Sequence, residues 1–80
     1  MDTSEKLFAI IDKYCETGYN HDLSVSIKDG LSLSSFEMMM IFYEIKLAFN
    51  IEIDYIRVSD LKTMADLVDY VSAKVGEKNE

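Results

Sequence analysis

Apolar residues recur at every third or fourth position in three segments of this chain, and this spacing constrains the fold more than any other feature. In a helix of about 3.6 residues per turn such residues line one face, so each segment predicts an amphipathic helix. The segments are residues 4–16, 34–49 and 63–75. Because 80 residues support only one small core, we expect residues 1–80 to form a single domain.

The first predicted helix is followed by a long connection, residues 18–34. Gly18 and Asn20 are turn residues that stop the helix. Leu23, Val25 and Ile27 then alternate with polar residues, which permits a strand, but a single strand without a partner is unstable. We therefore predict a structured loop held to the core by apolar anchors, namely Leu23, Val25, Ile27, Leu31 and Leu33.

The second predicted helix has a sharp start and an apolar surface on nearly every side. Ser34 and Glu37 form a capping-box pattern, in which each side chain bonds the other residue's backbone N–H, and Asn50 is a suitable end. One face of the helix carries Phe36, Met39, Phe42, Ile45 and Phe49. Further apolar residues are Met38, Met40, Ile41, Tyr43 and Leu47, and so small a protein cannot bury them all.

The last third of the chain predicts a short helical segment at residues 54–59 and a final helix. Thr63 and Asp66 make a weaker capping pair at the start of that helix, and Gly76 suits the residue after its end. Residues 76–80 are expected to be a frayed tail. The prediction is an all-α bundle of three to four helices with a long loop between the first two.

The charge balance disfavours a nucleic-acid-binding protein. Fifteen acidic and eight basic residues give a net charge of -7, whereas a nucleic-acid binder needs clustered cations. An acidic surface favours a partner with a basic patch, although such a surface also serves solubility alone. No apolar run approaches the roughly 20 residues of a membrane span, and the N-terminus lacks the pattern of a signal peptide. We expect a cytoplasmic monomer.

No combination of side chains predicts an enzyme or a metal site. Cys15 is the single cysteine, so it cannot form an internal disulfide. We expect it to be a small core or rim residue in the last turn of the first helix. His21 stands alone in the connection, with no acid–base partner evident from the sequence.

The segment from Asp29 to Glu37 resembles the prosthetic-group site of acyl carrier proteins. It reads Asp29-Gly30-Leu31-Ser32-Leu33-Ser34-Ser35-Phe36-Glu37, where that family has an acidic residue, a leucine-containing turn and then Asp-Ser-Leu opening the second helix. The similarity continues through Glu44, Phe49-Asn50-Ile51-Glu52-Ile53, Leu61-Lys62-Thr63-Met64, Leu67 and Asp69-Tyr70-Val71. It covers nearly the whole chain, from Leu7 to Val71.

The resemblance implies a carrier that is not itself an enzyme. A 4'-phosphopantetheine arm would be attached to a serine by a phosphopantetheinyl transferase and would hold acyl groups as thioesters for acyl-transferring and acyl-modifying enzymes. Those enzymes would belong to fatty-acid, polyketide or related biosynthesis. Ser35 keeps the family's spacing to Phe49 and Tyr70 without a gap, so we expect the arm there; Ser32 and Ser34 are the other candidates.

Two departures from the family bear on this hypothesis. Ser34 stands where the family has Asp, so Ser34-Ser35-Phe36 replaces Asp-Ser-Leu, which affects recognition by the transferase. The second helix is also less acidic and more apolar than its counterparts, which favours partners that use apolar contacts. The expected partner-binding residues are Phe36, Glu37, Met39, Met40, Tyr43 and Glu44.

Two alternatives stay open at the level of sequence. Met38, Met39 and Met40 could instead pack under the long connection. The whole protein could be a carrier-like helical adaptor that is never modified. The residues do not identify the cargo, whether fatty acyl, polyketide or aminoacyl.

Overall fold

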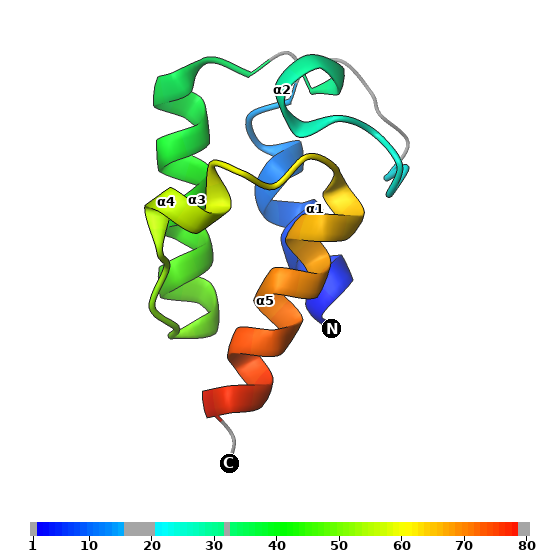
Figure 1. Ribbon diagram of the computed structural model, residues 1–80. Coiled ribbons are helices and arrows are strands. Elements are labelled where there is room, and N and C mark those ends of the chain that lie inside the picture. Colours follow the sequence, from blue (N-terminus) through cyan, green and yellow to red (C-terminus); the bar gives the residue numbers. More distant parts are fainter. Residues whose placement is uncertain (1, 16–20, 32, 79–80) are drawn as a thin grey trace.

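The computed structural model describes residues 2–15, 21–31 and 33–78, and this part of the chain is helical without a strand (Figure 1). Its long helices are α1 (Thr3–Asp12), α3 (Ser35–Phe49) and α5 (Met64–Lys78). The short helices α2 (Ile27–Gly30) and α4 (Tyr55–Val58) lie in the connections. The predicted all-α bundle is confirmed within these residues.

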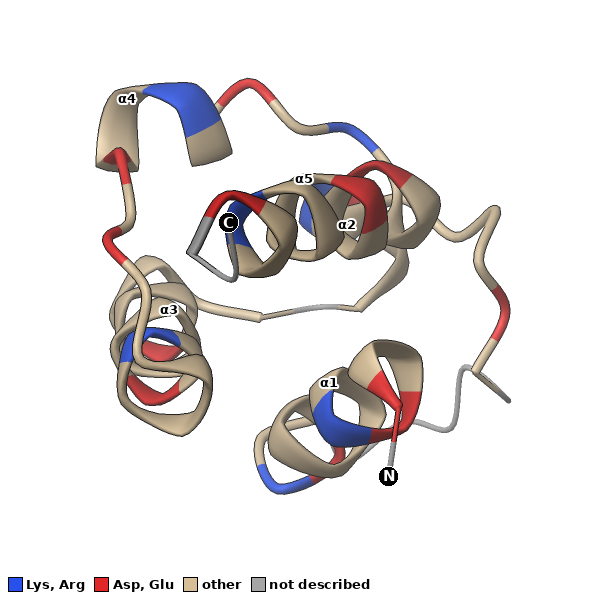
Figure 2. Cartoon of the chain, turned by 90° about the horizontal axis from the view of Figure 1, so that it is seen from below, with Lys and Arg blue, Asp and Glu red and all other residues tan. Residues whose placement is uncertain are grey.

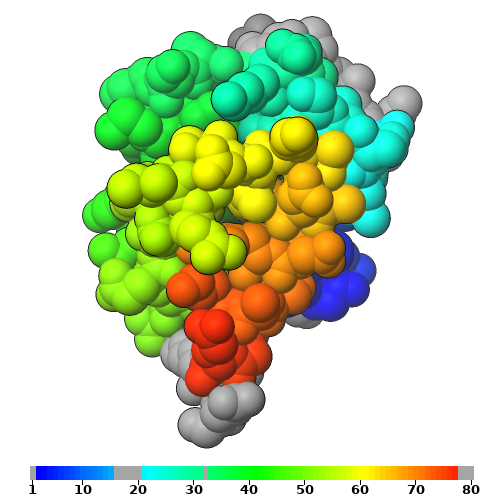
Figure 3. Space-filling model, in the orientation of Figure 1, coloured from blue at the N-terminus to red at the C-terminus, as the bar shows by residue number. Residues whose placement is uncertain are grey.

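The three long helices enclose one core. Helix α1 packs against both α3 and α5, and a view along the bundle places the three around a common centre (Figure 2). Helix α4 and the segment after it lie across one face, between α3 and α5 (Figure 3). All five helices contribute to the core, which comprises Leu7, Ile10, Ile11, Ile27, Leu31, Ile41, Phe42, Ile45, Ile51, Val58, Met64, Leu67 and Val71.

Helix α1 is shorter than the sequence predicts. It ends at Asp12, after which the Lys13 and Tyr14 N–H groups donate to carbonyls three residues earlier and tighten the last turn. The prediction that the helix reaches residue 16 is therefore wrong, and Cys15 lies beyond its end. The predicted stop at Gly18 and Asn20 lies outside the described residues.

The connection between α1 and α3 is anchored by pairing with the start of α5. The Ile27 N–H donates to the Lys62 carbonyl at 2.9 Å, and the Met64 N–H donates to the Val25 carbonyl at 3.1 Å. One antiparallel bridge, between Ser26 and Thr63, therefore provides hydrogen-bond partners for the backbone of the alternating segment without a full strand. The prediction of an anchored segment agrees with this pairing, but Leu23 is exposed and is not one of the apolar anchors. Helix α2 was not predicted.

Gly30 allows α2 to approach the preceding chain closely. A Cβ atom at this position would lie 2.3 Å from Val25 Cγ2, closer than real side-chain atoms approach one another. Glycine at this point therefore permits the tight turn that carries α2 over the core.

Helix α3 begins and ends at the predicted residues, but its buried residues do not follow the one face traced from the sequence. Asn50 takes the left-handed conformation, with φ of 53°, and caps the C-terminus as expected. Phe36 and Met39, which the sequence places on one face with Phe42 and Ile45, are exposed, as the expected partner-binding role requires. Ile41, Phe42 and Ile45 define the buried face instead. An almost uniformly apolar helix carries no periodic signal that could distinguish these faces.

Helix α5 starts as predicted and extends further than predicted. Thr63 and Asp66 each accept a hydrogen bond from the other residue's N–H, at 3.2 Å, which confirms the capping pair. The helix passes through Gly76 to Lys78, so the predicted end at Gly76 is wrong, and residues 79–80 lie outside the described residues. Glycine lowers helix propensity by about 1 kcal/mol but does not forbid a helix.

Candidate functional site

The adjacent serines Ser34 and Ser35 have different surroundings. Ser34 is the N-cap of α3: its hydroxyl accepts from the Glu37 N–H at 3.1 Å, and its own N–H donates to Glu37 Oε1 at 3.0 Å. Ser35 is the first residue of the helix, is exposed, and makes no side-chain hydrogen bond to the described residues. Both serines are exposed, so the two differ in that only the Ser34 hydroxyl is hydrogen-bonded within the described residues; the third candidate, Ser32, lies outside them.

Ser35 borders an apolar cleft of about 310 Å³. The cleft lies between α2, the first two turns of α3 and the segment from Val58 to Leu61, and we call it the Ser35 cleft. Most of its lining side chains are aliphatic or aromatic, and Lys28, Ser35 and Ser59 are the polar ones. The residues that line it are Ile27, Lys28, Leu33, Ser35, Met38, Phe42, Val58, Ser59 and Leu61.

The size and lining of the Ser35 cleft suit a small apolar group. Its volume is about twice that of a roughly 150 Å³ apolar cavity, which is large enough to bind benzene. Sheltering such a group from water is favourable in proportion to the apolar area removed from solvent. A group tethered to Ser35 could therefore lie in this cleft against the core residues Ile27, Phe42 and Val58.

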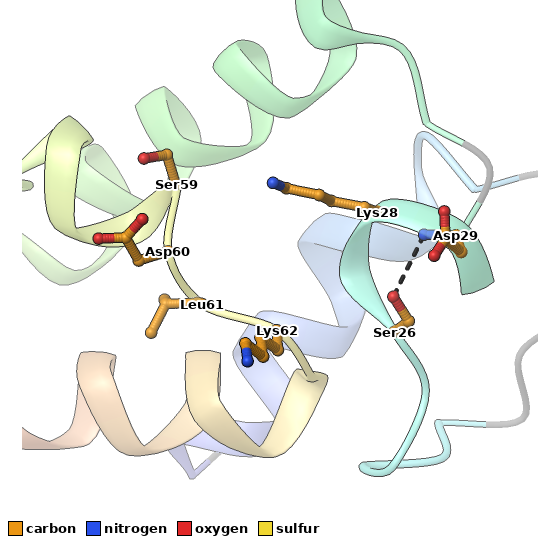
Figure 4. Close-up of a pocket in the computed structure, with 7 residues that line it drawn as sticks. All are labelled: Ser26, Lys28, Asp29, Ser59, Asp60, Leu61 and Lys62. Carbon is orange, nitrogen blue, oxygen red and sulfur yellow. Dashed lines mark hydrogen bonds between the residues drawn. The ribbon is translucent and has the colours of Figure 1, made fainter.

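A second cleft, more polar and about 400 Å³ in volume, adjoins the first (Figure 4). The two share Lys28, Ser59 and Leu61. We call the second one the polar cleft. Its other lining residues are Ser26, Asp29, Asp60 and Lys62.

An exposed apolar stripe runs the length of α3. It consists of Phe36, Met39, Tyr43 and Leu47, whose side chains are 70%, 63%, 50% and 60% exposed. Spacings of three and four residues place these four on one side of the helix. On the neighbouring α4, Ile56 is 80% exposed. This stripe is the main apolar surface on α3 available to a partner.

The two predicted partner-binding glutamates both have intramolecular roles. Glu37 belongs to the capping box. The Glu44 carboxylate accepts hydrogen bonds from the Lys13 ammonium and the Tyr14 hydroxyl, which ties α3 to the end of α1. These bonds, the Lys13 one foremost, hold the pKa of Glu44 below its ordinary value. The bond to Glu44 raises the pKa of Tyr14.

The six predicted partner residues thus divide into two groups. Phe36, Met39 and Tyr43 face solvent in the apolar stripe. Met40 is half-buried, as is its neighbour Met38, which lines the Ser35 cleft. The methionines therefore divide between the two interpretations: Met38 packs near the connection and Met39 does not.

The prediction that His21 stands alone is wrong. Its ring stacks on Phe8 with the ring centres 4.3 Å apart, and its Nε2 lies 2.9 Å from an Asp12 carboxylate oxygen. Cys15 is half-buried, with Sγ 3.5 Å from the Leu31 carbonyl oxygen. Among the described residues, no group of three or more His, Cys, Asp or Glu side chains could hold a metal ion.

The sequence did not identify Lys28, Ser59 or Val58 as residues of the site. Lys28 and Val58 lie in helices of a single turn, which are too short to give a periodic pattern. These residues meet Ser35 only because the two connections fold over the same end of α3. Leu61 and Leu33, in contrast, were expected to pack against the core, and both do so.

Comparisons with known proteins identified no relative of this chain. No protein-family model, curated protein or solved structure matches this chain. Within the described ranges, no helix is both long enough and apolar enough to cross a membrane.

Proposed function

We propose that this protein is an acyl carrier that bears a 4'-phosphopantetheine arm on Ser35. The observation that carries the proposal is the state of the Ser35 hydroxyl, which is exposed, makes no hydrogen bond to the described residues and lies at the border of an apolar cleft. The neighbouring Ser34 hydroxyl is already engaged in the capping box. The sequence resemblance to acyl carrier proteins supports the same residue.

The chemistry of attachment is compatible with this position. The Ser35 hydroxyl oxygen would form a bond to the coenzyme A phosphorus nearer the pantetheine, the hydroxyl proton would go to a base of the transferase, and adenosine bisphosphate would leave. The product is an anionic phosphodiester, which the N–H groups at the start of α3 would favour. When attached, the arm supplies a terminal thiol that holds acyl groups as thioesters.

The residues of the chain would position and shelter rather than catalyse. Ser34 and Glu37 fix the first turn of α3, so that Ser35 projects outward from a rigid element. Met38, Phe42 and Leu61 would shield an apolar cargo in the Ser35 cleft. In this function the protein is a monomer of the cytoplasm, and the chemistry belongs to its partner enzymes.

The apolar stripe on α3 is the surface we propose for those enzymes. Phe36, Met39 and Tyr43 would contact apolar groups, whereas Glu44 is already paired with α1. Binding through this stripe would depend weakly on salt, because apolar contacts are not screened. A client that dissociates steeply with rising ionic strength would count against this part of the proposal.

The test is the mass of the intact protein after incubation with coenzyme A, magnesium and a broad-specificity phosphopantetheinyl transferase. A gain of one arm that is absent in Ser35→Ala would support the function and the site. A gain that survives Ser35→Ala would keep the function and move the site to Ser32 or Ser34.

A second function, an unmodified helical adaptor, is favoured by the apolar stripe alone. Four exposed large side chains on one helix fit a protein-binding role that needs no arm. Absence of a mass gain with several transferases would make the adaptor the better explanation.

A further inference from the structure

Lys28 of α2 is the cation that lines the Ser35 cleft. It also lines the polar cleft, so its side chain lies where the two meet. In Figure 4 the side chain extends away from its neighbour Asp29 and toward Ser59. Its ammonium group is thus directed across the opening between α2 and the segment that follows α4.

The charge of Lys28 has no partner among the described acidic side chains. Lys13 pairs with Glu44, and Lys46 lies 4.0 Å from Glu52. Lys28 makes no such contact, although Asp29 and Asp60 also line the polar cleft. Lys28 is thus an unpaired cation on the cleft that Ser35 borders, in a chain with a net charge of -7.

A phosphodiester on Ser35 would place a negative charge at the border of the cleft that Lys28 lines. Ammonium groups form strong, charge-assisted hydrogen bonds to phosphate oxygens. Helix α2 is a single turn whose start is fixed by the buried Ile27 and its N–H bond to the Lys62 carbonyl. A bond from Lys28 would therefore link α2 to the modified start of α3.

We propose that Lys28 pairs with the phosphodiester on Ser35 and thereby holds α2 over the Ser35 cleft. This role rests on the proposed modification of Ser35. Lys28 is a positioning residue: its pairing orders the wall of the cleft and directs the start of the arm toward the apolar lining. Attachment of the arm, which we call loading, then rigidifies α2, so the unmodified and modified proteins differ in the mobility of this helix.

The Gly30 amide reports on this change, because its N–H donates to the Ser26 carbonyl at 2.7 Å inside α2. Hydrogen exchange at this amide would be compared before and after loading, with the mass of the intact protein confirming the modification. We expect loading to slow exchange about two- to fivefold at low salt, the range of an exposed ion pair. The effect should diminish in about 0.5 M salt because of screening.

Three variants make the comparison specific to Lys28. Lys28→Ala should lose the slowing on loading, whereas Lys28→Arg should keep it, because arginine also binds phosphate. Lys62→Ala is the matched control: Lys62 lines the polar cleft but not the Ser35 cleft, so its removal should leave the slowing intact. A purely structural role for Lys28 would change exchange equally in the loaded and unloaded proteins.

The outcomes separate this proposal from the one on which it rests. Loading that proceeds normally, with equal slowing in wild type and Lys28→Ala, would overturn the role of Lys28 and leave Ser35 as the site. A wild-type protein that gains no mass would overturn both. If the transferase rejects Lys28→Ala, Ser35→Glu supplies a fixed negative charge, and equal exchange with and without Lys28 in that background would overturn the pairing.

Discussion

The adjacent serines at the start of α3 should separate stability from modification. Ser34→Ala removes the hydroxyl that accepts from the Glu37 N–H and leaves the reciprocal bond to the Ser34 N–H in place. Ser35→Ala removes an exposed hydroxyl that makes no hydrogen bond to the described residues. The first change should therefore destabilise the fold, and the second should abolish only the attachment of the arm.

The expected difference follows from the geometry. Loss of a serine N-cap destabilises a protein by about 1 kcal/mol. Unfolding gains about 2.1 cal/mol/K per residue, or roughly 170 cal/mol/K for 80 residues, so Ser34→Ala should lower Tm by about 6 °C. Ser35→Ala should change the free energy of unfolding by less than about 0.5 kcal/mol, as exposed substitutions usually do.

Thermal and urea unfolding of the unmodified proteins would measure both effects, if the transition is two-state. Ser34→Asp is the matched control, because aspartate caps a helix about as well as serine and should restore stability. The same three variants would then be loaded with the transferase. Ser34→Ala and Ser34→Asp should gain the arm, and Ser35→Ala should not.

Two results would refute this reasoning. Equal loss of stability in Ser34→Ala and Ser35→Ala would show that the capping box does not distinguish the two hydroxyls. Retention of the arm in Ser35→Ala together with its loss in Ser34→Ala would assign the modification to the cap residue, against the geometry.

Three further predictions concern the packing that supports the site. Glu44→Gln should destabilise the protein at pH 7. The folded pKa of Glu44 is lowered, so the stabilisation by its ionised carboxylate is fully present above the ordinary value of 4.5 and is lost as the pH falls through the folded pKa. The urea midpoints of wild type and variant should therefore converge in acid. Ile45→Val should lower the free energy of unfolding by about 1 kcal/mol, whereas Leu47→Ala on the exposed stripe should change it by less than about 0.5 kcal/mol; equal values in urea titrations would contradict the assignment of the two faces. Gly30→Ala should cost about 1–3 kcal/mol, because its Cβ would meet Val25 Cγ2, and Val25→Ala in the same chain should recover part of that loss; additive losses in thermal unfolding would argue against the contact.

The features that were predictable from sequence are those set by neighbouring residues. The Ser34 and Glu37 cap, the Thr63 and Asp66 cap and the stop at Asn50 involve residues within one helical turn. The side chains of the two capping pairs bond backbone groups three residues away, and the Asn50 N–H bonds the Lys46 carbonyl, so the local pattern is sufficient. This is also why the sequence could place Ser35, rather than Ser34, at the first exposed position of α3.

The features that failed depend on residues distant in the chain. The end of α1, the buried side of α3 and the partners of His21 all depend on which segments pack together. Helix α3 is apolar nearly all round, so its own sequence cannot say which side faces α1. Glu44 likewise has the sequence context of a surface acid, and only packing brings the end of α1 within reach of its carboxylate.

The sequence by itself determined the three long helices, the cap that frees Ser35 and the resemblance that suggests its role. Tertiary structure alone brought α2 and the segment after α4 to the start of α3, forming the Ser35 cleft with Lys28 at its edge. The pairing of Val25 and Ile27 with Met64 and Lys62 fixes that arrangement. Closing such a long loop costs entropy that only the combined burial of many distant apolar residues can offset, and no local pattern of residues encodes that sum.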